Sequence, residues 1–319
     1  MGIFRLLFPR DRSKDTPGLM DAIERAVTRV EPLLMHTGNY PEAYRKPVMK
    51  ALEYARSLAL RVPGPVTVDF DSYARDAFVH AIFPSRDNIS EAFRTSLAMQ
   101  EYLREHHSPG DIYALMGMRR REKTTMGMEL SGQVIQQDVP QHMVYFISHT
   151  IENPAPSEKH AREQIAWSFF DSLVGKVASR VALRKQEMQA QRQELDLLMA
   201  RLRAANTQER PALESELSRM LNSMPSTANS LDFSNYLDDF KAVLLDPEQH
   251  LRLDQSAITL DSMGVRRDNG GTTQAVPIIF NELIGFDRRD WTVTLVHCRN
   301  IQSETFAARL ETAHRMLAI

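Results

Sequence analysis

Two histidines and the only cysteine are the residues best suited to covalent or metal chemistry. His149 and His297 lie near the ends of predicted strands, and Cys298 directly follows His297. An imidazole beside a thiol can lower the thiol pKa, and such a pair can act as a base, a nucleophile or a metal ligand. Successive residues of a regular strand point to opposite faces, however, so His297 and Cys298 should not share a site. We therefore assign no catalytic residue and no metal ligand here.

Familiar catalytic motifs are absent from the sequence. It contains no Gly-rich phosphate loop, no His-Glu-x-x-His helix and no Gly-x-Ser-x-Gly elbow. We therefore predict no cofactor, although a catalytic site could still be assembled from scattered residues. A single cysteine cannot form an internal disulfide, which fits a reducing compartment and predicts a cytoplasmic protein. The formal charge of -2 excludes a strong overall basic field for nucleic acid, but not a local one.

Basic residues gather at two predicted turns and give the clearest candidate binding site. The four that we select are Arg119, Arg120, Arg266 and Arg267. Guanidinium groups at paired hairpins could hold a phosphate, a nucleic-acid backbone or an acidic protein surface. Alternatively, they only solvate the turns or protect a sheet edge. No aromatic residues alternate with them along the sequence, which argues against stacking of single-stranded bases.

A methionine-rich segment accompanies the first basic turn. Alternate positions of a strand share one face, so these methionines form a flexible apolar surface that either belongs to the core or binds a partner. They are Met116, Met118, Met126, Met128 and Met143.

Residues 157–206 are the element around which the chain is organised. We predict one long helix from Ser157 to Ala205, because nearly fifty residues pass without a proline. Its apolar residues recur at threes and fours, as in a coiled coil or a helical hairpin. The later part should fold back on a short helix that begins near Pro211. The earlier part should pack on the sheets or on a second chain through Phe170, Leu173, Val177 and Val181.

The long helix joins two predicted lobes, each with helices followed by an antiparallel meander. Apolar periodicity predicts four helices before the first meander, the last from about Ser90 to Glu105. The first meander consists of the predicted strands Tyr113–Met118, Met126–Ile135 and His142–Ile151. The second consists of the predicted strands Leu251–Val265, Thr273–Leu283 and Trp291–Cys298, with a hairpin turn at residues 268–271 and a last helix at 303–317.

The two lobes share landmarks that suggest an internal repeat. Asp69-Phe70 and Tyr73 match Asp232-Phe233 and Tyr236, at an offset of about 161 to 163 that other pairs also show. Helix starts attract Asp and turns attract Gly, so the matches alternatively reflect only a common layout. The predicted helices and antiparallel meanders together indicate an α+β fold. We expect an N-terminal arm at 1–15, a first lobe at 16–156, the long helix at 157–206 and a second lobe at 207–319.

The segment 1–15 is predicted to be an arm folded onto the protein. Its apolar run is interrupted by Arg5 and is too short for a secretory signal. The alternative is peripheral membrane contact through Ile3, Phe4, Leu7 and Phe8. No segment is predicted to cross a membrane.

Taken together, the patterns favour a non-catalytic interaction or regulatory protein. The long helix and the two lobes would bind a protein partner or a second copy of the chain, and an acidic partner or phosphate would bind the basic turns. The alternative is an enzyme or small-ligand sensor whose scattered site lies between the lobes.

Overall fold

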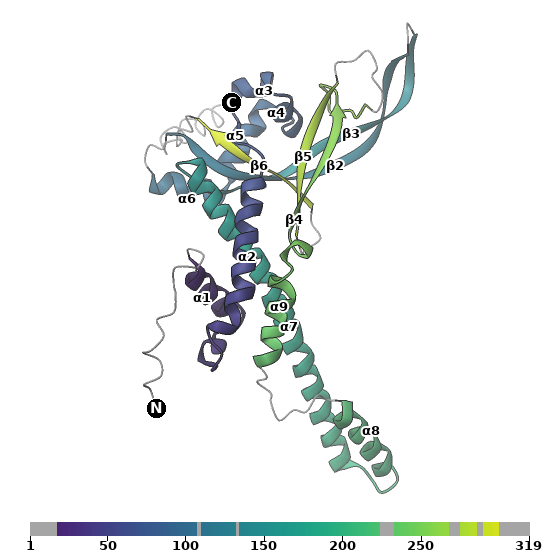
Figure 1. Ribbon diagram of the computed structural model, residues 1–319. Coiled ribbons are helices and arrows are strands. Elements are labelled where there is room, and N and C mark those ends of the chain that lie inside the picture. The colour runs from purple at the N-terminus through teal and green to yellow at the C-terminus, as the bar shows by residue number, and fades with distance from the viewer. Residues whose placement is uncertain are drawn as a thin grey trace, which may run out of the picture. The chain divides into compact units, whose positions relative to one another are not determined.

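The computed structural model describes residues 18–106, 110–131, 134–223, 233–267, 275–285 and 290–299 (Figure 1). The predicted arm at 1–15, the hairpin turn at 268–271 and the helix at 303–317 lie outside them. The chain forms two compact units, each assembled from segments far apart in sequence. Unit 1 comprises Met1–Tyr54 and Phe170–His250, and unit 2 comprises Ala55–Phe169 and Leu251–Ile319. These units do not coincide with the lobes expected at 16–156 and 207–319, because α2 (Glu42–Arg61) and α7 (Glu158–Ala204) contribute residues to both.

Unit 1 is helical, and the long helix expected at 157–205 is confirmed as α7. Apart from α7 and the start of α2, its helices are α1 (Leu19–Val30), the 3-10 helices η2 (Pro32–His36) and η4 (Pro247–Gln249), α8 (Arg210–Ser223) and α9 (Phe233–Leu244). The apolar face of α1 is packed against the rest of the protein, since Ile23, Ala26 and Val27 are completely buried. The ring of Tyr44 on α2 packs edge-on against Phe240 on α9, with the centroids 5.0 Å apart.

Ion pairs fix the neighbours of α7 within unit 1. Arg25 on α1 donates to Asp171 on α7, with 2.6 Å between Nε and Oδ1. Asp239 on α9 is buried and accepts from Arg180 and Arg184, each through Nε at 3.1 Å. Arg184 occupies a position where the three-and-four spacing of α7 would bring an apolar residue, and its pairing with a buried carboxylate explains how a charge is tolerated there.

The end of α7 and α8 form a helical hairpin, as the sequence predicted. Leu198 on α7 and Leu213 on α8 are buried, and Leu195, Leu202, Leu217 and Met220 are half-buried. Asn206 stabilises the connecting turn, because its side chain accepts hydrogen bonds from the backbone N–H groups of Gln208 and Glu209 at 3.0 Å.

Unit 2 contains one mixed sheet with the strand order β3-β2-β6-β5-β4, in which β1 (Val66–Thr67) also pairs in parallel with β6. The other strands are β2 (Ile112–Ser131), β3 (Val134–Ala155), β4 (Arg252–Leu260), β5 (Val276–Ile284) and β6 (Asp290–Cys298). Strands of both expected meanders therefore lie in a single sheet. The turn after β4 reaches the outer edge of β3, where Val144 N donates to Gly264 O at 2.8 Å and Arg266 N donates to His142 O at 2.8 Å.

The first expected meander is corrected to a two-stranded hairpin. The segments expected as Tyr113–Met118 and Met126–Ile135 are mostly covered by the single strand β2, which continues through the charged residues 119–123. Pairing with β3 holds this segment extended, whereas its polar residues on both faces hide the alternation that identifies a strand. The second meander is confirmed as β4, β5 and β6. A hairpin and a meander differ in layout, so the internal repeat is not confirmed.

Short helices cover one face of this sheet and complete a core. They are α3 (Phe70–Arg75), α4 (Ala77–Ile82), α5 (Arg86–Thr95) and α6 (Leu97–Glu105). Ile82, Phe83 and Met99 pack with Met116 and Phe280 of the strands. We call this covered side of the sheet the core face.

Two of the helical breaks come from capping side chains. Asp76 accepts from Phe78 N at 2.8 Å and begins α4, and Ser96 accepts from Met99 N at 3.2 Å and begins α6. The single helix expected at Ser90–Glu105 is therefore two helices, because Ser96 caps the second one.

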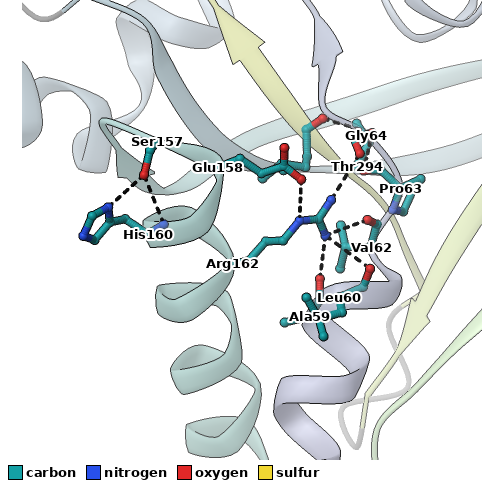
Figure 2. Close-up of polar contacts among 11 residues, drawn as sticks. Ala59, Leu60, Val62, Pro63, Gly64, Ser157, Glu158, His160, Arg162 and Thr294 are labelled. Atoms are coloured by element: carbon teal, nitrogen blue, oxygen red, sulfur yellow. Dashed lines mark hydrogen bonds and ion pairs between the residues drawn. The ribbon is translucent and has the colours of Figure 1, made fainter.

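Arg162 joins the start of α7 to the end of α2 within unit 2 (Figure 2). Its guanidinium donates to the carbonyl oxygens of Ala59 at 2.8 Å, Val62 at 3.0 Å and Gly64 at 3.1 Å, and its Nε donates to Glu158 at 2.8 Å. The last carbonyl oxygens of a helix lack donors within the helix, and here the half-buried guanidinium of Arg162 donates hydrogen bonds to them. The intervening Pro63 accepts from Leu295 N at 2.7 Å, which ties the same turn to β6.

Candidate functional site

Arg119 and Arg120 were predicted to lie at a turn, and this prediction is wrong. Both residues lie in the middle of β2. They point to opposite faces, because Arg119 pairs with Ile147 and Arg120 with Phe146 across the hairpin. Arg120 is half-buried on the core face, where Nη1 lies 2.6 Å from Glu282 and 3.0 Å from the hydroxyl of Ser256. Its charge is therefore neutralised within the sheet.

Arg266 and Arg267 follow β4 and do not join Arg119 in one cluster of turn charges. Arg267 Nη2 lies 3.0 Å from Asp261, whose carboxylate also accepts from Met263 N and Val265 N at 2.9 Å. The backbone of Arg266 pairs with that of Leu260 in a single antiparallel β-type contact. The predicted paired basic turns are thus replaced by local contacts that close the turn after β4.

A different set of cations forms an open basic surface. Arg119, Arg121 and Lys123 occupy alternate positions of β2 and share the side of the strand that faces away from the core. Arg121 and Lys123 are exposed and Arg119 is half-exposed. Within the described part of the chain, Arg119 and Arg121 form no side-chain ion pair or hydrogen bond. Their charge is available to a ligand.

Two aromatic side chains flank these cations from neighbouring strands. Tyr145 on β3 is directly opposite Arg121 and is 36% exposed, with Lys123 Nζ 5.6 Å from the ring centroid. Trp291 on β6 lies beside Gly117, where an added Cβ would be 3.4 Å from the indole. We call Arg119, Arg121, Lys123, Tyr145 and Trp291 the basic face. The sequence could reveal the i, i+2, i+4 cations, but not the aromatics, because these come from other strands.

The α7–α8 hairpin of unit 1 contains a second open surface. A groove of about 530 Å³ runs between the helices. Leu197, Leu198 and Met220 are among the residues that line it, and Leu197 has 62% of its surface exposed. The exposed charged residues around it are Glu194 and Arg201 from α7, and Glu216 and Arg219 from α8.

The four residues predicted as a helix interface are not part of this groove. Phe170, Leu173, Val177 and Val181 are at most 1% exposed in the single chain. These four side chains are therefore covered within the single chain, and ion pairs place α1 and α9 of the same unit beside this part of α7.

His149 and His297 are held by separate structural contacts. His149 Nε2 lies 2.8 Å from the carbonyl oxygen of Ile82, and the ring stacks on Phe83 at 4.8 Å. His297 stacks on Tyr113 at 4.5 Å, and its Nε2 lies 3.4 Å from Asp111, a distance that allows an ion pair but not a good hydrogen bond. Cys298 belongs to the core, and burial raises the pKa of its thiol. The geometry provides no activated thiolate.

We expect His149 to make unit 2 less stable at acidic pH. Burial lowers the pKa of His149 from its usual 6.5, although the hydrogen bond to Ile82 acts in the opposite direction. The unfolded chain then binds more protons between the two pKa values, so stability falls as the pH is lowered from about 7 through the folded-state pKa. Thermal unfolding of His149→Gln between pH 7 and 5 should show a weaker pH dependence than the parent. An identical dependence would contradict this role.

The methionines divide between the core and the solvent. Met116 and Met118 are completely buried on the core face, whereas Met126 and Met128 are 65% and 67% exposed further along β2. Met143 is half-buried. The methionines therefore do not form one continuous surface.

Comparisons with protein-family models, curated proteins and solved structures find no match. In the described residues, no group of His, Cys, Asp and Glu side chains could hold a metal ion. Nor does any described helix combine the length and apolar character that crossing a membrane requires.

Proposed function

We propose that this chain is a non-catalytic interaction protein that self-associates through the α7–α8 hairpin. The observation that carries the proposal is the small apolar interior of the hairpin. Among residues 184–222, only Leu198 and Leu213 are buried. Burial of a leucine contributes about 1.5–3 kcal/mol, whereas ordering each residue costs about 1–2 kcal/mol. The hairpin therefore needs additional packing from outside its own two helices. The groove, with its exposed Leu197, is the surface against which another helix can pack.

The charges at the groove favour a second copy of the same chain as its occupant. Glu194 and Arg201 are two turns apart, so they lie on the same side of α7. A parallel copy would bring like charges together. An antiparallel copy, with its two-fold axis near Leu197 and Leu198, would place Glu194 of each chain against Arg201 of the other and bring the two Leu197 side chains under cover.

Charge reversal tests this arrangement. Glu194→Arg should weaken self-association about tenfold, because two symmetric contacts become repulsive, and Arg201→Glu should do the same. The double variant Glu194→Arg/Arg201→Glu restores opposite charges and should regain the parent dissociation constant. Sedimentation equilibrium measures all four proteins.

The matched control is Glu187→Arg, which changes the same charge on an exposed position of α7 outside the groove. It should leave self-association unchanged. Equal dissociation constants for the parent and both single variants would refute the antiparallel arrangement.

A further inference from the structure

We infer that the basic face of unit 2 binds single-stranded nucleic acid. Alternate residues of a strand are about 6.6 Å apart, so Arg119, Arg121 and Lys123 form a straight row of cations. Such a row can follow the phosphates of an extended strand, with the guanidinium groups donating to phosphate oxygens. Their partial or full exposure means that binding requires no rearrangement of the sheet.

The flanking aromatics distinguish this surface from a simple polyanion site. Single-strand binding proteins combine a positively charged track with aromatic rings on which bases stack. Tyr145 and Trp291 supply rings on the same side of the sheet as the cations, one from each neighbouring strand. Lys123 lies over the Tyr145 ring, and an incoming base would take its place while the ammonium moves to a phosphate.

A single strand fits better than a duplex or an acidic protein. In a duplex the bases are stacked on one another, so their faces are not available to Tyr145 and Trp291. An acidic protein would use the cations but would gain nothing from stacking. The proposed ligand is therefore single-stranded DNA or RNA without base specificity, since each base presents a π-face.

Fluorescence anisotropy with a labelled 20-nucleotide oligo(dT) and the full chain tests the inference. Three phosphate contacts predict a slope of about −2 for log affinity against log salt concentration. The variant Arg119→Glu/Arg121→Glu/Lys123→Glu should lose at least about tenfold in affinity. Tyr145→Ala should lose about fivefold or more, and Tyr145→Phe should retain the parent affinity because the ring remains.

The control carries the same charge change on the other side of the sheet. Arg75, Arg94 and Arg104 are exposed on the helices that cover the core face, and reversing all three to Glu should change the affinity by less than about threefold. Retention of the parent's thermal midpoint shows that each variant is folded.

Three outcomes would overturn the inference. The first is parent-like affinity in the triple variant of the basic face, and the second is no binding by the parent at low salt. The third is competition by poly-glutamate as effective as competition by unlabelled oligo(dT) of equal charge, which would identify an acidic protein as the better ligand. None of these outcomes depends on self-association, because the hairpin residues are unchanged in all these proteins.

Discussion

Replacing Val177 and Val181 together by Asp should abolish the cooperative unfolding of unit 1. Both side chains are at most 1% exposed within the single chain. Each substitution places a carboxylate in an apolar environment without a partner, at a cost of several kcal/mol. The combined loss is comparable to the whole stability of a typical domain, about 5–15 kcal/mol. Thermal unfolding followed by circular dichroism and solubility measures the effect.

The control for this variant is Ala182→Asp/Leu183→Asp, on exposed positions of the same helix. It adds the same two charges, and a carboxylate in the middle of a helix costs only about 1 kcal/mol or less in propensity. A cooperative transition of Val177→Asp/Val181→Asp near the parent temperature would show that this part of the seam is not covered by the chain itself.

Arg162→Ala should destabilise unit 2 by about 1–3 kcal/mol, the typical cost of leaving buried hydrogen-bond acceptors unsatisfied. The arginine side chain is 13% exposed, and it serves the carbonyl oxygens at the end of α2 as well as Glu158. The substitution leaves these acceptors without their donor. Chemical denaturation of the variant and the parent gives the difference in free energy of unfolding.

Two further variants separate this network from a general effect of charge. Arg162→Lys should lie between the parent and Arg162→Ala, because one ammonium cannot reproduce the planar set of donors. Lys159→Ala removes an exposed cation from the same turn of α7 and should change stability by less than about 0.5 kcal/mol. Equal stability of Arg162→Ala and Lys159→Ala would contradict the structural role of Arg162.

The long helices could be predicted because their signals are local. Residues 157–205 lack proline and show continuous helical periodicity, and α7 indeed runs from Glu158 to Ala204. The fold back of α8 follows from the matching apolar residues on both sides of the Asn206 turn. Ser96 is an equally local capping signal, but the apolar pattern continues past it and predicts one unbroken helix from Ser90 to Glu105.

The candidate surfaces were harder to predict because they depend on pairing between distant strands. In the sequence, the charged residues 119–123 resemble a turn. In the structure they pair continuously with β3, so they belong to a strand and their side chains alternate between its two faces. Tyr145 becomes a neighbour of Arg121 only through that register. Likewise, the sequence shows Arg184 only as a charge among the apolar residues of the helix, whereas the fold places Asp239 beside it.

Self-association is the central claim, and light scattering coupled to size-exclusion chromatography tests it most directly. The parent should have about twice the chain mass of 36.4 kDa. Leu197→Glu should remain folded, since position 197 is exposed in the single chain, but should elute with the mass of one chain. A parent with the mass of one chain at every concentration, or a Leu197→Glu variant that keeps the doubled mass, would contradict the proposal.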